Sequence, residues 1–189
     1  MALNNTVRII GGKWRGKKLS FPSDSPIRPT LDHVRETLFN WLQPYIIDSH
    51  CLDAFAGSGA LGIEALSRGA ERVTFIDHNT TTLSQLKNNL HSLDTNNYDC
   101  FCLKLPENLS LLTSPAYDII FLDPPFHTDL LNQTLNALIT SHLIKAETLI
   151  YFETSIHHQF NENKKNSAWE IVKYKKTKRM VYGLLQKQP

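Results

Sequence analysis

The feature that most constrains the fold is an alternation of short apolar segments with longer amphipathic segments, which begins near residue 50. Short apolar runs bounded by turn residues are typical of strands, and apolar residues at helical spacing are typical of helices. Predicted strands are 51–54, 72–76, 99–103, 118–122 and 148–152, and predicted helices are 61–68, 80–93 and 129–139, with a short turn near 107–112. The alternation predicts an α/β fold of the Rossmann-like, doubly wound kind, with a mostly parallel sheet.

The end of the chain breaks this alternation. Residues 169–175 and 179–186 have the pattern of two further strands with no helix between them. Strands joined by a short turn pair antiparallel, so we expect a seven-stranded sheet that ends in an antiparallel hairpin at its edge. Parallel sheets with this ending occur in methyltransferases that use S-adenosylmethionine (SAM), which is an analogy at the level of the fold alone.

The beginning of the chain is predicted to be an extension of the main domain. Residues 7–21 have the pattern of a hairpin, in which apolar and basic residues alternate around Gly11, Gly12 and Gly16. Residues 22–29 contain three prolines and are expected to form an irregular linker. Thr30 is placed to cap a helix over 31–42. We therefore divide the chain into a docking extension, 1–27, and a main domain, 28–189.

Charge is unevenly distributed along the chain. The 189 residues carry a net charge of only +2, but residues 8–18 and 173–179 each contain five Lys or Arg and no acid. Two basic segments around a near-neutral middle predict contact with a polyanion, although two solvated faces would give the same pattern.

Composition also limits the cellular setting. The apolar runs are too short to span a membrane, and the first residues lack a secretory signal, so we expect a cytoplasmic protein without a membrane partner. The spacing of Cys51, Cys100 and Cys102 does not suit zinc. It predicts reduced core cysteines and no metal site.

A glycine-rich turn follows the strand predicted at 51–54. Gly57, Gly59 and Gly62 match the G-x-G-x-x-G pattern of dinucleotide sites, and Asp77 lies where a ribose-binding acid belongs. The spacing alone would allow NAD as the cofactor. Asp53 is unfavourable beside a pyrophosphate, however, and suits the ammonium group of a methionine moiety. The turn therefore favours SAM, with Asp77 accepting hydrogen bonds from both ribose hydroxyls.

The segment Asp123-Pro124-Pro125-Phe126 follows a predicted buried strand. A carboxylate, two stiffening prolines and an aromatic ring suit a flat ligand that carries an amino group. The carboxylate of Asp123 and the carbonyl of Pro124 would accept both N–H protons, and Phe126 would stack on the ring. The segment predicts methyl transfer to a nucleobase amine, in which proximity and alignment supply much of the rate.

Five segments, 8–16, 28–30, 34–42, 53–62 and 123–126, together resemble the RsmD family of bacterial 16S rRNA guanine-N2 methyltransferases. The first and third are the most specific, whereas the last two are shared with many SAM enzymes. The resemblance covers about residues 7–186. It implies methyl transfer to the N2 amine of one guanine in 16S rRNA. It also implies the assembling or assembled small ribosomal subunit as the partner, and we expect the enzyme to act as a monomer.

The motifs and the resemblance together give the expected site residues. Cofactor-binding residues are Asp53, Phe55, Gly57, Gly59, Asp77 and His78; catalytic residues are Asp123, Pro124 and Phe126; RNA-binding residues are Lys13, Trp14, Arg15, Lys17, Lys18, Arg28 and Arg35. Trp14 would stack on a base among cations that contact phosphates, and Arg35 would be structural or phosphate-binding. Lys104-Leu105 depart from the family pattern at the position that reads the adenine amine, so backbone atoms are expected to contact adenine.

Three alternatives remain at this point. A DNA adenine-N6 methyltransferase uses nearly the same loop chemistry, although the basic hairpin and the lack of a large target-recognition domain weigh against it. An NAD-dependent oxidoreductase would explain the glycines but not the segment 123–126. A non-catalytic RNA-binding or assembly factor would have no need of Asp123 and Phe126.

Overall fold

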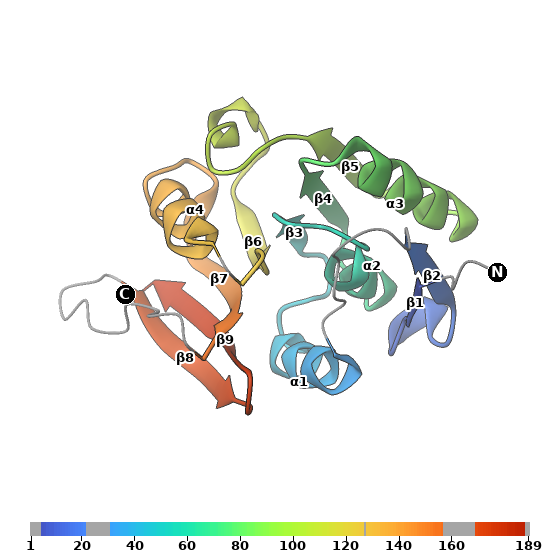
Figure 1. Cartoon of the computed structure of the whole chain (residues 1–189), viewed down its shortest axis with the longest axis horizontal. Helices are drawn as coiled ribbons and strands as arrows, with labels where there is room; N and C mark the ends of the chain where they lie inside the picture. The colour runs from blue at the N-terminus through green and yellow to red at the C-terminus, as the bar shows by residue number, and fades with distance from the viewer. Residues whose placement is uncertain (1–4, 22–30, 127, 157–168, 188–189) are drawn as a thin grey trace. The chain divides into compact units, whose positions relative to one another are not determined.

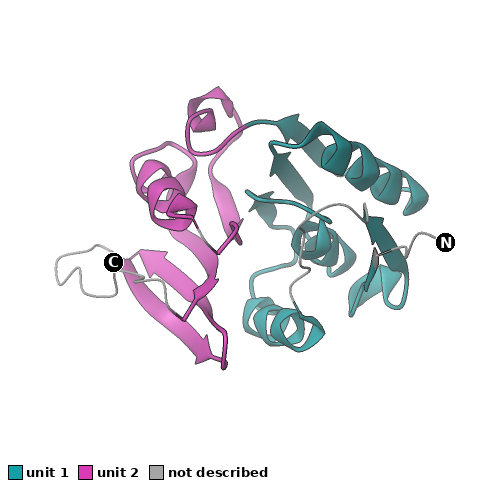
Figure 2. Ribbon diagram, viewed as in Figure 1, with its two compact units in different colours: residues 1–103 teal, residues 104–189 magenta. Residues whose placement is uncertain are grey.

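A computed structural model of the chain describes residues 5–21, 31–126, 128–156 and 169–187. The chain divides into two compact units, residues 1–103 and 104–189 (Figure 2). Each unit is an α/β arrangement in its own right (Figure 1).

The first unit contains the N-terminal hairpin and the first half of the alternating region. Its elements are β1 Asn5–Arg8, the 3-10 turn η1 Gly12–Trp14, β2 Lys18–Phe21, α1 Asp32–Leu42, β3 His50–Asp53, α2 Ala60–Ser67, β4 Arg72–Asp77, α3 Thr80–Ser92 and β5 Tyr98–Cys102. Strands β1 and β2 pair antiparallel, whereas β4 pairs parallel with both β3 and β5. Helix α2 packs on β3 and β4, and α3 packs on β4, β5 and β2.

The second unit contains the rest of the α/β region and the C-terminal hairpin. Its elements are the 3-10 turn η2 Leu109–Leu111, β6 Tyr117–Leu122, α4 Leu130–Ile139, β7 Ile144–Ser155, β8 Trp169–Lys176 and β9 Met180–Lys187. Strand β7 pairs parallel with β6 and antiparallel with β9, and β9 pairs antiparallel with β8. The strands of this unit therefore have the order β6-β7-β9-β8. The predicted fold class, mostly parallel with an antiparallel C-terminal hairpin, is confirmed.

Most element boundaries lie within two residues of those predicted, but two predictions were wrong. Strand β7 runs for 12 residues, Ile144–Ser155, rather than over 148–152. Its first residues are mostly exposed, so they lack the apolar pattern that would have revealed them. Helix α1 begins at Asp32 with Leu31 as its N-cap and no side-chain cap bond, rather than with Thr30, which lies outside the described residues.

The N-terminal hairpin is fastened to α2 through one buried carboxylate. The side chain of Glu64 is fully buried, and its two oxygens accept hydrogen bonds from the backbone N–H groups of Ile10 and Gly11, both at 2.8 Å. Arg68 Nε donates to the same carboxylate at 2.7 Å. The hydroxyl of Ser67 donates to Gly11 O at 2.6 Å, which ties the hairpin loop to the end of α2. Buried charges are stable only when paired and hydrogen-bonded, and Glu64 meets that condition.

The loop of the hairpin approaches α2 so closely that only glycine fits at position 12. Gly12 has a φ of +73°, and a Cβ built there would lie 1.8 Å from Ser67 O. Gly16 has a similar φ of +86°, but a Cβ there would meet nothing within 4 Å. The first glycine is therefore required by both backbone and space, and the second by backbone alone.

The cysteines are less uniformly buried than predicted. All three are free, with Cys51 buried, Cys100 half-buried and Cys102 exposed on β5. The prediction of core cysteines is therefore wrong for Cys102, because β5 is an edge strand whose last residues are exposed. Desolvation raises the pKa of the Cys100 thiol to about 11, which keeps it protonated. Among the described residues, no helix is long and apolar enough to cross a membrane.

Candidate functional site

The turn between β3 and α2 has the geometry of a nucleotide-binding loop. Gly57 and Gly59 have φ values of +51° and +77°, which side chains strongly disfavour. The turn is held by two backbone bonds, from Ala56 N to Ile76 O at 2.8 Å and from Gly59 N to Ala56 O at 2.7 Å. Gly62 lies in α2, where a Cβ would come within 2.2 Å of the ring of Phe75. The glycine pattern therefore combines a tight turn with close packing of the helix on the sheet.

Two carboxylates at the ends of neighbouring parallel strands define this loop. Asp53 is 2% exposed, and its Oδ2 accepts a hydrogen bond from Gly62 N at 2.9 Å. Asp77 accepts hydrogen bonds from Gly57 N at 3.0 Å and from Asn79 N at 2.8 Å. These bonds fix the orientation of both side chains. The turn is thus shaped for a ligand with hydroxyl or amino groups at the carboxyl ends of β3 and β4.

The other two predicted cofactor residues flank the same loop. Phe55 is half-buried within the turn, and His78 is exposed directly after β4. His78 Nδ1 lies 3.6 Å from Asp77 Oδ1. The structure therefore brings Asp53, Phe55, the glycines, Asp77 and His78 together in the first unit.

The segment 123–126 begins where β6 ends, in the second unit. Asp123 and Phe126 are half-buried, whereas Pro124 is buried. The Oγ1 atom of Thr128 donates to Pro125 O at 2.7 Å, which closes the loop as a turn. Proline rings and this bond make the loop stiff, so the carboxylate of Asp123 is held near the carboxyl end of the strand.

Behind this loop lies a buried acid that sequence reasoning missed. Glu153 on β7 is 5% exposed, and Tyr151 Oη donates to its Oε2 at 2.9 Å. Desolvation, and secondly the charge of Asp123, raise the pKa of the Glu153 carboxyl to about 9. The signal in the sequence was a lone acid at the end of an apolar strand, a position that a core strand rarely gives to an ionised group.

The N-terminal hairpin presents its cations to solvent but not its tryptophan. Lys13, Arg15, Lys17 and Lys18 are exposed. Trp14 is only 6% exposed, and its backbone N–H donates to Ser67 Oγ at 3.0 Å. The ring of Trp14 therefore has no free face for a nucleobase, and the expectation of stacking is corrected. Lys13 Nζ lies 4.2 Å from the centroid of that ring.

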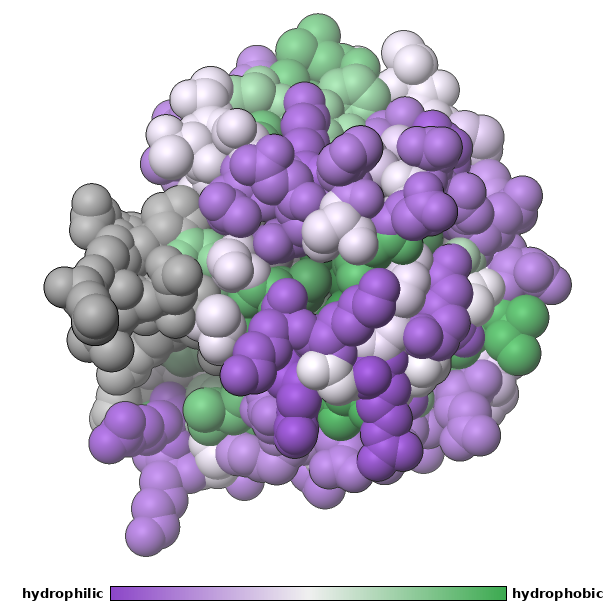
Figure 3. Space-filling view, turned by 90° about the vertical axis from the view of Figure 1, so that its right-hand side faces the viewer, coloured by the Kyte–Doolittle hydropathy of each residue, from purple (hydrophilic) through white to green (hydrophobic). Residues whose placement is uncertain are grey.

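The face of the molecule that Figure 3 shows is largely hydrophilic, with a band of hydrophobic residues between the polar side chains.

The two predicted RNA-binding arginines outside the hairpin do not both remain candidates. The Arg35 side chain is 0% exposed, and its Nη2 donates to Arg8 O at 2.8 Å and to Asp32 Oδ1 at 2.7 Å. Of the two roles considered for Arg35, the structural one is supported, since phosphate cannot reach a fully buried guanidinium. Arg28 lies outside the described residues.

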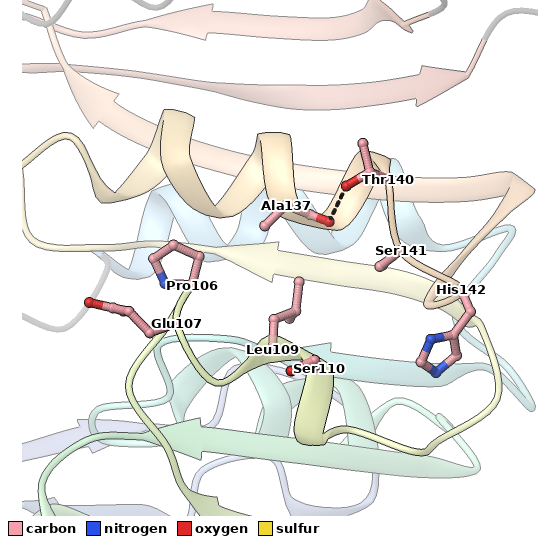
Figure 4. A pocket seen from close by; sticks show the side chains of 8 residues that line it. All are labelled: Pro106, Glu107, Leu109, Ser110, Ala137, Thr140, Ser141 and His142. Carbon is pink, nitrogen blue, oxygen red and sulfur yellow. Dashed lines mark hydrogen bonds between the residues drawn. The ribbon is translucent and has the colours of Figure 1, made fainter.

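A hollow of about 470 Å³ lies elsewhere in the second unit, between η2 and the end of α4 (Figure 4). It is lined by Pro106, Glu107, Leu109, Ser110, Ala137, Thr140, Ser141 and His142. None of these residues belongs to the predicted site. Among the described residues, no group of three or more His, Cys, Asp or Glu could hold a metal ion.

Comparison with known proteins gives the family. Residues 7–186 match a family model described as "Conserved hypothetical protein 95". The chain is 44% identical to ribosomal RNA small subunit methyltransferase D of Haemophilus influenzae, covering 95% of this chain and 93% of that protein. It is 42% identical to the Escherichia coli protein of the same name, covering 96% and 90%.

A solved structure agrees with this. An Escherichia coli protein described as a methyltransferase aligns with a TM-score of 0.87 and 41% identity, covering 97% of this chain and 99% of that one. Family match, sequence identity and fold coincide over nearly the whole length of the chain. The chain belongs to the RsmD family, the family of the ribosomal RNA small subunit methyltransferase D proteins.

Proposed function

We propose that this protein transfers a methyl group from SAM to the exocyclic N2 amine of one guanine in 16S rRNA of the small ribosomal subunit. The observation that carries the proposal is the loop at the end of β6, where a half-buried carboxylate, Asp123, is held between a core strand and a stiff proline turn. The family adds the substrate class, because its curated members are named as small-subunit rRNA methyltransferases.

The first unit has the groups that SAM requires. Asp77 is oriented by two backbone N–H groups and would accept the ribose hydroxyls, and the glycine turn would let the ligand approach the backbone closely. Asp53 would attract the ammonium of the methionine moiety, while its bond to Gly62 N keeps the carboxylate in place. Phe55 and His78 would flank the adenosine. When bound, SAM supplies a methyl group that is attached to a sulfonium, and the sulfur is the leaving group.

The second unit supplies groups suited to an aromatic amine. The lone pair of such an amine is delocalised into the ring, so the free amine is a weak nucleophile. Accepting hydrogen bonds from both N–H groups favours a tetrahedral nitrogen and concentrates the lone pair on it, which is the role we assign to Asp123 and the Pro124 carbonyl. The methylated nitrogen would then release one proton to solvent. Phe126 would hold the base by stacking. Positioning supplies the remaining rate enhancement.

Two exposed basic segments are suited to the polyanionic substrate. Lys13, Arg15, Lys17 and Lys18 belong to the extension 1–27, which we propose as a docking element. The β8–β9 hairpin presents Lys173, Lys175, Lys176, Lys178 and Arg179, all exposed. Contacts of this kind position the enzyme on the phosphate backbone without reading sequence.

The test is methyl transfer from labelled SAM to small subunits that lack the modification, followed by mapping of the product. Label on one guanine, as N2-methylguanine, is the expected result. Label on an adenine, or on naked DNA only, would contradict the proposal. Equilibrium binding compares NAD with S-adenosylhomocysteine. If NAD stabilises the folded protein and S-adenosylhomocysteine does not, the protein is an oxidoreductase rather than a methyltransferase.

The role of Asp123 is tested separately with the variant Asp123→Ala. The rate of methyl transfer should fall by about a hundredfold or more, the order expected for a group that acts on the amine protons in the transition state. SAM binding should persist. Asp118→Ala is the matched control, because Asp118 lies near the start of the same strand and pairs with Lys145. Full activity in Asp123→Ala would remove Asp123 from the chemistry.

A further inference from the structure

Glu153 lies beside Asp123 because of the strand register. Strands β6 and β7 are parallel, and Leu122 is the register partner of Phe152. Continuing this register by one residue places Asp123 next to Glu153, and neighbours in register on parallel strands extend to the same side of the sheet. Two carboxyl groups therefore emerge together at the carboxyl end of the second unit's sheet.

Aromatic rings surround Tyr151, whose hydroxyl donates to the deeper of the two carboxyl groups. Tyr151 precedes Glu153 by two residues on the same side of β7, and Tyr182 on β9 is the register partner of Glu153. The ring centroids of Tyr151 and Tyr182 are 6.5 Å apart. The ring centroid of Phe121, on the neighbouring strand β6, also lies 6.5 Å from that of Tyr151. Among the described residues, Asp123 and Tyr151 are the titratable groups that act on Glu153, and Tyr182 acts on Tyr151; none of the three carries a positive charge.

We propose that Glu153 is a positioning residue for the methyl transfer: it remains protonated beside Asp123 and holds that carboxylate in the orientation that accepts the amine protons. This role rests on the proposed function of Asp123. It adds a residue that the motif at 123–126 does not contain.

The chemistry of two adjacent carboxyls supports this assignment. Like charges at short range cannot both be accommodated in a site shielded from water, so one group of the pair retains a proton. Glu153 is 5% exposed, whereas Asp123 is half-buried, and the more buried group is the one that stays neutral. Tyr151 Oη already donates to Oε2 of Glu153, so the proton of Glu153 belongs on Oε1. The raised pKa of Glu153 agrees with this distribution.

The first test measures protonation without any substrate or cofactor. Carbon-13 NMR of carboxyl-labelled protein follows Glu153, assigned with Glu153→Gln, over a pH titration. We expect its resonance to titrate near 9, and Asp123→Asn to lower that value because it removes the neighbouring charge. A Glu153 signal that titrates near 4.5, or one that Asp123→Asn does not move, overturns the proposal.

The second test uses transfer to small subunits as a function of pH. In wild type, kcat should fall by about tenfold per pH unit once Glu153 ionises, because the second charge displaces Asp123. The amide of Glu153→Gln can still donate a hydrogen bond to Asp123 and accept one from Tyr151. The kcat of this variant should therefore not fall at alkaline pH. It should also exceed the kcat of Glu153→Ala by about tenfold or more. SAM affinity should be the same in all three proteins.

The outcomes separate this inference from the proposed function. An equal alkaline fall in wild type and Glu153→Gln, or equal activity of Glu153→Gln and Glu153→Ala, overturns the positioning role while the methyl transfer stands. No transfer by wild type to any small subunit overturns the proposed function, whereas the NMR titration still reports on the carboxyl pair. Circular dichroism shows whether Glu153→Ala is folded.

Discussion

The acids of the proposed site differ in what surrounds their carboxyl groups. Asp53 and Asp77 are the last residues of β3 and β4, and backbone N–H groups bind each of them. Burial of Glu153, and secondly the charge of Asp123, raise the pKa of its carboxyl, and the hydrogen bond from Tyr151 opposes this rise. Burial away from water favours the neutral acid over the carboxylate.

Asp77 provides a prediction for cofactor affinity. Asp77→Asn keeps one acceptor oxygen but loses the charge and the second acceptor, so we expect SAM affinity to fall by about 10- to 100-fold, the usual cost of a charged hydrogen bond. Isothermal calorimetry measures this. Asp99→Asn is the control, because Asp99 is a carboxylate of the same unit bound to Arg72 on the surface. Equal affinities of wild type and Asp77→Asn would show that Asp77 does not bind the ribose.

Glu153 provides a prediction for stability as a function of pH. The folded-state pKa of about 9 lies above the ordinary value of 4.5, so between these values only the unfolded chain releases the proton. Stability from this group is fully present below about 4.5 and is lost as the pH rises toward 9. Relative to wild type, Glu153→Gln should therefore gain stability with rising pH, by up to about 1.4 kcal/mol per unit.

Urea unfolding at several pH values measures this difference. Glu71→Gln is the matched control, because Glu71 is exposed and pairs with His50 at the surface. Its difference from wild type should not grow over the same range. A constant difference between wild type and Glu153→Gln would mean that Glu153 is ionised in the folded protein.

The sequence predicts a site residue where a motif marks it. It does not predict a role that depends on whether the side chain is buried. The glycines, Asp53, Asp77 and Asp123 follow strands at recognisable spacing, so sequence identified them. Trp14 is predicted to contact RNA because it lies among the cations of the hairpin, and Arg35 is predicted to be structural or phosphate-binding. Their burial depends on α2 and on the carbonyl of Arg8, contacts that are distant in sequence and leave no local pattern.

At the scale of elements, the N-terminal hairpin is part of the first unit and not a loosely attached arm. Its loop is bound to α2 through Glu64 and Ser67, and its second strand packs on α3. Local alternation of apolar residues predicted the hairpin itself. The attachment to α2 was not predictable, because a buried glutamate inside a helix has the same sequence signature as an exposed one.

Two glycines of the hairpin allow a matched test of this attachment. Gly16→Ala should cost only the strain of a positive φ, about 1 kcal/mol. Gly12→Ala carries the same strain and also collides with Ser67 O, so its cost should be larger by roughly 1–3 kcal/mol. Urea unfolding compares the two variants, and proteolysis of residues 5–21 reports whether the loop has detached. Equal stability of the two alanine variants would show that the loop does not depend on α2.

At the scale of the whole molecule, charge is concentrated on two hairpins while the net charge is only +2. The first unit exposes three lysines on the N-terminal hairpin and Lys87 on α3, and the lysines of β8 and the following turn are exposed in the second unit. Composition predicted both segments. Their exposure is a property of the fold, since β8 is bonded to another strand on one side only.

Binding of small subunits should depend on both segments. Arg15→Glu and Lys175→Glu should each weaken binding and reduce the slope of log affinity against log salt by about one, as expected for loss of a phosphate contact. Filter binding in the presence of S-adenosylhomocysteine measures the slope. Lys145→Glu is the control, since Lys145 is exposed but pairs with Asp118. A slope that is unchanged for Lys175→Glu would exclude β8 from the docking surface.

The lysines of β8 have a second physical effect. In the sheet order β6-β7-β9-β8 this strand is last, and its outer row of N–H and C=O groups could pair with another copy of the chain. Charged side chains along such a strand discourage that pairing, because two copies would bring like charges together. Neutralising several of these lysines at once should therefore favour aggregation as well as weaken RNA binding, whereas a single charge reversal leaves most charges of the strand in place.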